Sequence, residues 1–459
     1  MGIGIIKKRF ITAALVAAMV AVSVACGNTD GGDEASSETG TVEVSVTTED
    51  LQLDLISETT DTSKAQEPEA SEESQPEVIL GDEQFDEYLP LLEEKRVALF
   101  ANHTSIVGDD DEHILDALLE RNVDIVAIFS PEHGFRGTED AGATIDDSVD
   151  EKTGVPILSL YGNDDTHSPA KEDMDKFDVL VVDMQDVGLR YYTYYISMYY
   201  LMDACAAEAK EVIILDRPNP NGFYVDGPIL QEKYSSNVGR LPIPVVYGMT
   251  WGELAGMING EGWLTAGVDA CKLTVIPCKN YTHQTKTSLI RNPSPNIKDM
   301  RAVYLYASTC FFENTVISVG RGTDYPFEVY GSPYLEGVAG FDFSFTPKSM
   351  SGALEPPFMD KNCYGEDLRE VPIEEIWEKG VDPEYLVKAY NAYKETSNTD
   401  VFWGKEYAKD TYWIDYLSGS NSLRKMIEEG KNADEIKASW QEDISAFKEQ
   451  REPYLLYDE

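Results

Sequence analysis

The chain has 459 residues, which at roughly 100–200 residues per domain predicts about two domains, and 42% of them are hydrophobic. Its 37 lysines and arginines are outnumbered by 83 aspartates and glutamates, giving a formal net charge of -46. This balance argues against nucleic acid as a partner and against adhesion to an anionic bilayer through basic patches, because both need clustered cations.

The first 26 residues are predicted to be a lipoprotein signal peptide. A basic cluster at residues 7–9 precedes an apolar run, residues 11–25, that is too short for a comfortable membrane span. The run ends at Cys26 in the sequence VACGN, which resembles a bacterial lipobox, although Ser23 stands where that pattern prefers leucine. Lipid attachment to Cys26 would anchor the chain at the extracellular face of the cell membrane. The alternative is an ordinary signal peptide with an incidental cysteine.

Residues 27–84 are predicted to form a disordered acidic linker. Residues 27–80 contain 15 acidic side chains and one lysine, and they are rich in serine, threonine and glycine. Such a composition cannot bury enough apolar surface to order itself. We expect a solvated spacer between the anchor and the folded body.

Short apolar runs alternate with helical patterns from residue 85 to residue 245. Strands are predicted at 96–100, 123–129, 156–160, 179–182 and 212–215. Helices are predicted at 113–120 behind a cap at 109–111, at 168–176 with Ser168 as cap, and at 196–210. This alternation predicts an α/β fold, a Rossmann-like doubly wound parallel sheet covered on both faces.

The second half, residues 246–459, is less regular. A helix is predicted at 250–259, strands at 272–277 and 303–306, and helices over 374–459. We expect a smaller α+β domain that closes over an active-site cleft.

Polar motifs follow the five predicted strands of the first domain. They contain Asn102 and His103; Glu132 and His133; Tyr161; Asp183, Gln185 and Asp186; and Arg217 and Asn219, in that order. Ligands bind outside the carboxyl ends of the strands in open parallel sheets. These side chains are therefore expected to converge on one crevice.

Several catalytic motifs are missing from the sequence. It has no G-x-S-x-G elbow, no G-x-x-x-x-G-K-[ST] loop and no H-E-x-x-H helix, and Gly320-Arg321-Gly322 lacks the third glycine of a dinucleotide loop. His103, Glu132, His133 and Asp183 are zinc ligands by type, but no pair has i, i+3 or i+4 spacing. We expect no metal and no cofactor. A hydrolase that works with carboxylates fits better.

The cysteines other than Cys26 are odd in number and show no metal-type spacing. We expect most of them to be small buried hydrophobic side chains outside any disulfide framework.

Glu132 is the best candidate for a catalytic acid. It follows a strand and precedes Phe135, and burial beside an aromatic ring raises a carboxyl pKa. The equal alternative is a structural role, in which Glu132 caps the next turn or pairs with Arg136. Asp183 and Asp186 are candidates for the second carboxylate, or for holding sugar hydroxyls, with a structural turn as the alternative.

Arginines and tyrosines supply candidate binding groups. Arg190, Arg217 and Arg321 are suited to clamp an anionic substrate group, although each has a structural ion pair as its alternative. One of the four tyrosines at 191, 192, 194 and 195 is expected to stack on a sugar, and the others to pack.

Eight motifs together resemble one known family. They are NHT (102–104), SPEHGFRG (130–137), SLYG (159–162), DMQDVGLRYYTY (183–194), DRPNPNG (216–222), GMT-x-GE (248–253), PSPN (293–296) and SVGRGTDYPFE (318–328). The series is similar to the exo-β-N-acetylmuramidase family, formerly a domain-of-unknown-function family. The resemblance implies a glycoside hydrolase that releases N-acetylmuramic acid from the non-reducing end of peptidoglycan fragments. It also implies a Rossmann-like domain with a smaller C-terminal domain and a cleft between them, without metal or nucleotide.

The resemblance places the catalytic glutamate at Glu132, and the lactyl carboxylate of muramic acid suits an arginine clamp. We assign catalysis to Glu132, His133 and Asp186. We assign substrate binding to Asn102, His103, Asp183, Gln185, Arg190, Tyr192, Arg217, Asn219, Arg321 and Asp324.

The chain departs from the family pattern in places. Tyr247 stands where the family has histidine, the segment before Gly222 is a residue shorter than expected, and the element after the predicted strand at 272–277 differs. Tolerance of a peptide stem is one hypothesis. Two other classes stay open: a sugar- or muropeptide-binding lipoprotein without turnover, and a hydrolase of cell-wall amides or esters.

Overall fold

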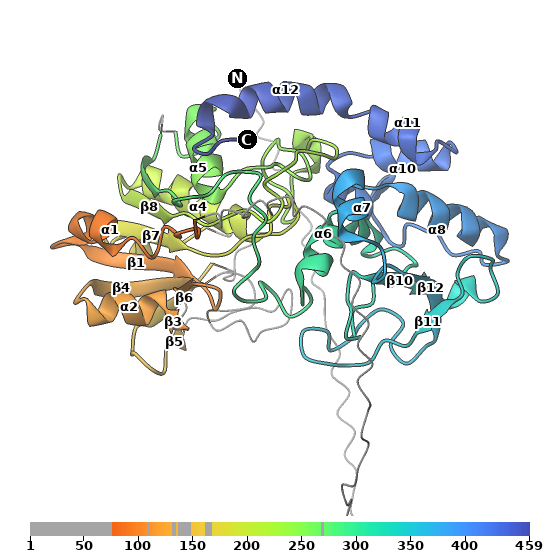
Figure 1. The fold of residues 1–459 in the computed structure, drawn as a ribbon, viewed down its shortest axis with the longest axis horizontal. Coiled ribbons are helices and arrows are strands. Elements are labelled where there is room, and N and C mark those ends of the chain that lie inside the picture. The colour runs from red at the N-terminus through yellow and green to blue at the C-terminus, as the bar shows by residue number, and fades with distance from the viewer. Residues whose placement is uncertain (1–75, 109–110, 131–134, 136–147, 161–167, 268–269) are drawn as a thin grey trace, which may run out of the picture. The chain divides into compact units, whose positions relative to one another are not determined.

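The computed structural model describes residues 76–459, except 109–110, 131–134, 136–147, 161–167 and 268–269 (Figure 1). Cys26, Glu132, His133, Arg136 and Tyr161, which the sequence singles out, lie outside the described residues. Within the part described, every helix is too short or too polar to cross a bilayer.

A seven-stranded sheet forms the first half, in the order β5-β6-β4-β1-β7-β8-β9. Its strands are β1 Arg96–Ala101, β4 Asp124–Ser130, β5 Ser148–Val149, β6 Pro156–Ser159, β7 Val179–Asp183, β8 Glu211–Leu215 and β9 Lys272–Ile276. All neighbours pair in parallel except the edge pair β5–β6, which is antiparallel. The predicted doubly wound parallel sheet is confirmed.

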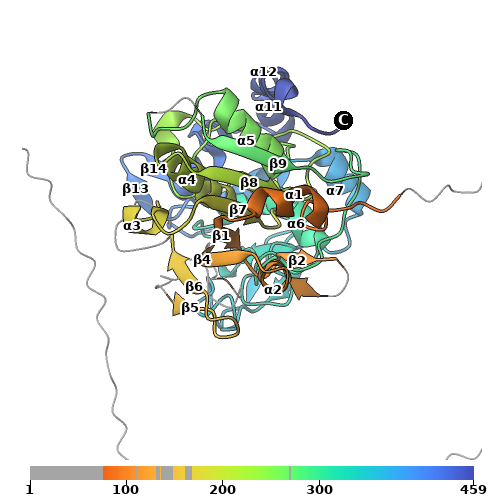
Figure 2. The same cartoon turned by 90° about the vertical axis from the view of Figure 1, so that its left-hand side faces the viewer.

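The sheet is buried on both faces because successive side chains of each strand enter different cores. In β1, Val97 and Leu99 join one cluster of buried residues, and Ala98 and Phe100 join the other. Helices α1 Phe85–Leu92 and α2 Ile114–Glu120 cover the first face, and α3 Lys171–Met174 and α4 Tyr194–Ala207 cover the second (Figure 2).

The folded body extends past both ends of the predicted domain at 85–245. Strand β9 pairs with β8 along its whole length, from Glu211 opposite Lys272 to Leu215 opposite Ile276. Before residue 85, the Gly81 amide donates to the Asp216 carbonyl at 2.9 Å, and Ile79 forms a bridge with Lys279. Residues 76–84, predicted as linker, therefore pack on the sheet.

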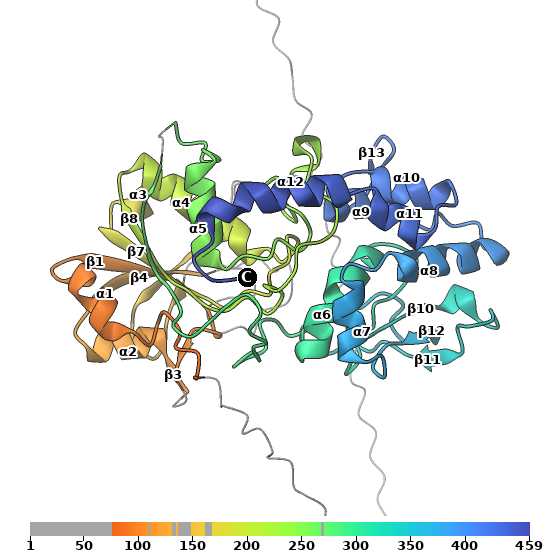
Figure 3. The same ribbon diagram turned by 45° about the horizontal axis from the view of Figure 1, so that its top comes forward.

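The second half has the predicted α+β character. Strands β10 Val329–Ser332, β11 Phe343–Phe345 and β12 Cys363–Asp367 form an antiparallel sheet in the order β10-β12-β11. Its helices are α5 Trp251–Gly260, which returns to the first sheet, α6 Met300–Thr309, α7 Ile373–Lys379, α8 Glu384–Glu395, α9 Trp413–Ser418, α10 Ser422–Glu428, α11 Ala433–Ala438 and α12 Gln441–Arg451. Helix α12 runs from α11 back to α5 (Figure 3).

The remaining elements are short. They are β2 Ile106–Val107, β3 Glu112–His113, the hairpin β13 Glu406–Ala408 with β14 Thr411–Tyr412, and the 3-10 turns Glu232–Tyr234, Cys310–Phe312, Pro333–Leu335 and Glu452–Tyr454. The five cysteines of the described residues are buried free thiols, as predicted.

Three local predictions are wrong. Residues 303–306, predicted as a strand, lie in α6, which begins where the Asp299 carboxylate accepts from the Ala302 amide at 2.8 Å. A four-residue apolar run does not distinguish a helix buried on all sides from a strand. Helix α2 is capped by the His113 ring, and α3 begins after Ala170, three residues later than its predicted cap.

Candidate active site

A cavity of about 680 Å³ lies between segments of both halves of the fold. Its lining includes Tyr191, Tyr192 and Tyr194 from the loop after β7 and the start of α4, Ser294 and Asn296 of the PSPN motif, Glu313, Arg321, Phe327 and Trp413. This volume is typical of a small-molecule site, and polar groups among aromatic rings suit a sugar. The cavity is our candidate active site.

Arg321 brings a positive charge to the cavity. Its Nε and Nη2 donate to Glu313 Oε1 at 2.9 and 2.5 Å, and the guanidinium lies 5.0 Å from the centre of the Phe327 ring. Burial disfavours the charge, but attraction to Glu313 raises the pKa of Arg321 above its ordinary value. The arginine side chain is 23% exposed and that of Glu313 20%, so the pair can be reached from the cavity.

Tyr192, the predicted binding tyrosine, reaches this cavity together with Tyr191 and Tyr194. The hydroxyls of Tyr192 and Tyr194 both donate to the Pro293 carbonyl, at 2.8 and 3.0 Å, and their rings meet edge to face. The two side chains therefore hold the PSPN segment against the loop after β7.

Arg190 is buried away from the cavity. Its Nη1 donates to the carbonyls of Pro228 and Ile243, both at 2.7 Å, and its Nη2 to that of Leu417 at 2.8 Å. Burial lowers its pKa to about 10. These contacts tie the loop after β7 to α9, and the structure does not bring Arg190 to the candidate site.

Arg217 forms a buried ion-pair network at the ends of β7 and β8. Its Nε donates to Asp183 Oδ1 and its Nη2 to Asp82 Oδ2, each at 2.6 Å. Burial, only partly offset by Arg217, raises the pKa of Asp82 to about 8. The network is the structural ion pair that the sequence left open as the alternative for Arg217. For Asp183 the alternative was a structural turn, and the sequence analysis missed Asp82 as a member of the network.

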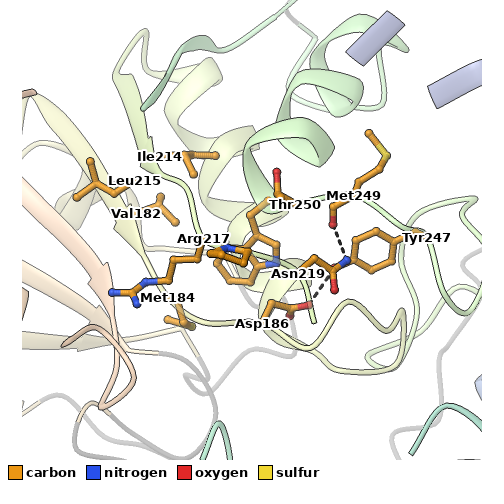
Figure 4. Close-up of a pocket in the computed structure, with 12 residues that line it drawn as sticks. Val182, Met184, Asp186, Ile214, Leu215, Arg217, Asn219, Tyr247, Met249 and Thr250 are labelled. Atoms are coloured by element: carbon orange, nitrogen blue, oxygen red, sulfur yellow. Dashed lines mark hydrogen bonds between the residues drawn. The ribbon is translucent and has the colours of Figure 1, made fainter. Parts of the chain in front are cut away.

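Asp186 faces a second, much smaller cavity of about 10 Å³ (Figure 4). Its Oδ1 accepts from the Gly188 amide at 2.6 Å and from the Tyr247 hydroxyl at 2.9 Å. Burial raises its pKa to about 7. Its Oδ2 and the Trp251 Nε1 have no hydrogen-bond partner among the described residues, and the space is about that of one water molecule. In Figure 4 the guanidinium of Arg217 points away from this carboxylate.

Two family-model matches identify the chain. The model described as exo-beta-N-acetylmuramidase NamZ, N-terminal, matches residues 97–301, and the corresponding C-terminal model matches residues 304–457. The chain belongs to the NamZ family.

Relatives of the chain agree with this membership. It is 33% identical over 389 residues to the peptidoglycan beta-N-acetylmuramidase NamZ of Bacillus subtilis, covering 81% of this chain and 89% of that protein. A DUF1343 family protein from Bacteroides fragilis, known as a crystal structure, is 53% identical with a TM-score of 0.74, and covers 84% of this chain and all of that one. A second such protein from the same organism is 28% identical with a TM-score of 0.65 over 83% of this chain and 99% of that one.

Asn102, Gln185 and Asn219, which were also predicted as site residues, hold the loops at the strand ends. Asn102 Oδ1 accepts from the Thr104 amide at 2.9 Å, Gln185 Nε2 donates to the Pro218 carbonyl at 2.9 Å, and Asn219 Nδ2 donates to the Met249 carbonyl at 2.8 Å. His103 Nε2 and the Asn292 carbonyl are 2.8 Å apart. Asp324 is 91% exposed and 3.9 Å from Lys298. These residues thus lie outside the lining of the large cavity.

Sequence reasoning missed Glu313 and Trp413, which both line the cavity. Glu313 lies eight residues before Arg321, close to the SVGRGTDYPFE motif, and this position could have indicated it as a site residue. No neighbouring motif indicates Trp413. Among the described residues, no cluster of three or more histidine, cysteine, aspartate or glutamate side chains could hold a metal ion.

Proposed function

We propose that the protein is an exo-acting β-N-acetylmuramidase that releases N-acetylmuramic acid from the non-reducing end of peptidoglycan fragments. Membership of the NamZ family over residues 97–301 and 304–457 carries this proposal, together with the B. subtilis relative named for this activity. The 680 Å³ cavity supports it, because a site of this size lined by tyrosines and one reachable arginine fits an anionic sugar.

The proposed chemistry is hydrolysis by carboxylates. Glu132 is the proton donor to the leaving glycosidic oxygen, and His133 and Asp186 assist. A carboxyl group with a pKa raised to about 7 can exchange a proton near neutral pH, which is the property of Asp186. Asp186 borders the small cavity, so its influence on the reaction is proposed to pass through Tyr247 and the loop after β7.

Arg321 is proposed to bind the lactyl carboxylate of N-acetylmuramic acid. Of the three arginines predicted as clamps, it is the one that lines the cavity, whereas Arg190 and Arg217 are 0% and 4% exposed. Glu313 occupies the Nε and Nη2 side of the guanidinium, leaving Nη1 for the substrate.

The experiment is the release of p-nitrophenol from p-nitrophenyl β-N-acetylmuraminide by the wild type and by Glu132→Gln. We expect turnover by the wild type and a loss of at least about a hundredfold in the folded variant. The matched control is Glu120→Gln on the exposed end of α2, which should keep full activity. No turnover by the wild type, combined with tight binding of muropeptides, would contradict the proposal and favour a binding lipoprotein. Turnover unaffected by Glu132→Gln would refute the assignment of the acid.

The N-terminal residues are proposed to make the protein a membrane-anchored lipoprotein at the extracellular face of the cell membrane. The basic cluster, the apolar run and the lipobox-like sequence ending at Cys26 support this proposal. The wild type should incorporate labelled palmitate, and the Cys26→Ala variant should not. The variant should also be absent from the membrane fraction. Equal labelling of both proteins would contradict the anchor.

A further inference from the structure

Trp413 lines the cavity from the first residue of α9. The indole is only partly buried, although tryptophan gains much from full burial, and its Nε1 has no hydrogen-bond partner in the described part of the chain. The Nε1 atom itself is buried, so the part of Trp413 that is exposed at the cavity is the apolar face and edge of the ring, which has the properties of a ligand contact.

A second ring continues this aromatic surface outward. Tyr407 of β13 is 45% exposed, and its ring centre lies 5.4 Å from that of Trp413 with 40° between the planes. The two rings, which we call the aromatic rim, lead from the cavity to the protein surface.

Buried charges hold the aromatic rim in place. The Asp415 carboxylate accepts from the Tyr412 amide at 3.0 Å, which fixes the start of α9 directly before Trp413. Arg424 donates from Nε to Asp415 Oδ1 at 2.9 Å and from Nη2 to the carbonyl of Asp410, in the β13–β14 turn, also at 2.9 Å. One buried guanidinium therefore fixes both elements that carry the rings. Because the two rings are already held in place, binding a ligand costs little conformational entropy.

We infer that the aromatic rim binds the uncharged N-acetylglucosamine ring that follows the cleaved N-acetylmuramic acid. This inference rests on the proposed function and adds a binding site for the leaving part of the substrate. The C–H bonds of a pyranose ring give it an apolar, slightly positive face, which suits the negative face of an indole. The net charge of -46 on the chain disfavours an anionic peptide stem, although Lys405 Nζ lies 5.5 Å from the centre of the Tyr407 ring and Asp410 is paired with Arg424 and Lys425.

The test compares two substrates with alkoxide leaving groups of different size. The disaccharide MurNAc–GlcNAc offers a second ring, whereas methyl β-N-acetylmuraminide offers a single carbon in its place. For Trp413→Ala we expect kcat/KM on the disaccharide to fall about tenfold, equivalent to about 1.4 kcal/mol, and kcat/KM on the methyl glycoside to change less than about twofold. Tyr407→Ala should show a smaller loss of the same kind, and Trp413→Phe should recover most of the activity.

Tyr364→Ala is the matched control, since Tyr364 is a partly buried ring on β12 that lies outside the cavity lining. Equal losses on both substrates, or no loss on either in folded Trp413→Ala and Tyr407→Ala, would overturn the inference. A loss confined to substrates with a peptide stem would also overturn it. If the wild type hydrolyses neither glycoside, the proposed function fails. Calorimetric titration with the disaccharide then tests binding at the aromatic rim by itself. A Kd about tenfold weaker in Trp413→Ala than in the wild type would support the inference, and an unchanged Kd would overturn it.

Discussion

Replacing Asp186 with asparagine should change how the stability of the protein depends on pH. Burial raises the pKa of Asp186 from 3.8 to about 7, so the folded state keeps a proton that the unfolded chain releases near pH 4. The raised pKa therefore contributes stability at low pH that is lost as pH rises to about 7. The shift of about 3 pKa units corresponds to about 4 kcal/mol in total, of which about 3 kcal/mol falls between pH 5 and pH 8.

Asparagine has the shape of the carboxyl group but does not ionise. It keeps an oxygen for the Gly188 amide and the Tyr247 hydroxyl, and its NH2 takes the place of Oδ2, which has no partner in the described residues. The Trp251 N–H, which lowers the pKa of Asp186, would then meet an NH2 group instead of a carboxyl oxygen, and this costs about 1–2 kcal/mol at every pH. The free energy of unfolding of Asp186→Asn, measured relative to that of the wild type, should therefore rise by about 3 kcal/mol between pH 5 and pH 8. The variant should be the more stable protein at pH 8.

The assay is urea unfolding of both proteins at pH 5, 6, 7 and 8, which gives the difference in free energy of unfolding at each pH. Asp82, Asp216 and Glu328, whose pKa values burial also raises, are present in both proteins and cancel in this difference. Asp324→Asn, at a 91% exposed position, reports the effect of removing a surface charge. A difference that varies by less than about 0.5 kcal/mol over this range would refute the reasoning.

Three further predictions follow from single hydrogen bonds and charges. Tyr457→Phe should lower the free energy of unfolding by about 1–3 kcal/mol in urea denaturation, since the Tyr457 hydroxyl accepts from the Cys278 amide, which would be left buried without a partner, whereas Asp216 Oδ2 keeps its hydrogen bond from the Thr250 hydroxyl. An unchanged midpoint would contradict this. Arg321→Gln should reduce kcat/KM on the muraminide roughly ten- to hundredfold while Arg321→Lys retains part of it, and equal activity of all three proteins would exclude the clamp. Tyr247→Phe removes a donor that lowers the pKa of Asp186, so the pH up to which stability keeps falling should move up by about one unit, as followed by unfolding at several pH values. A curve that superimposes on that of the wild type would argue against this hydrogen bond.

The sheet was predictable because fully buried parallel strands read as short, continuous apolar runs. The run at 179–182, for example, contributes Val179 and Val181 to one core and Leu180 and Val182 to the other. The same kind of run misleads at 303–306, where burial on all sides of α6 removes the amphipathic pattern of a helix.

The candidate site was predictable only in part, because the partners of a charged side chain are distant in sequence. Arg217 is a structural cation owing to Asp82, which lies 135 residues away in a segment predicted as linker. Arg190 and Arg321 look alike as residue types, and only their burial among carbonyls or beside the cavity separates them. Trp413 reaches the cavity from the far end of the chain, a contact for which local sequence gives no signal.

The most direct test of the proposed exo-acting muramidase is a comparison of two isomeric disaccharides, MurNAc–GlcNAc and GlcNAc–MurNAc, with products identified by mass spectrometry. An exo-acting enzyme that removes N-acetylmuramic acid from the non-reducing end should cleave the first into its two sugars and leave the second intact. Cleavage of the second disaccharide, or of neither, would contradict the proposed function.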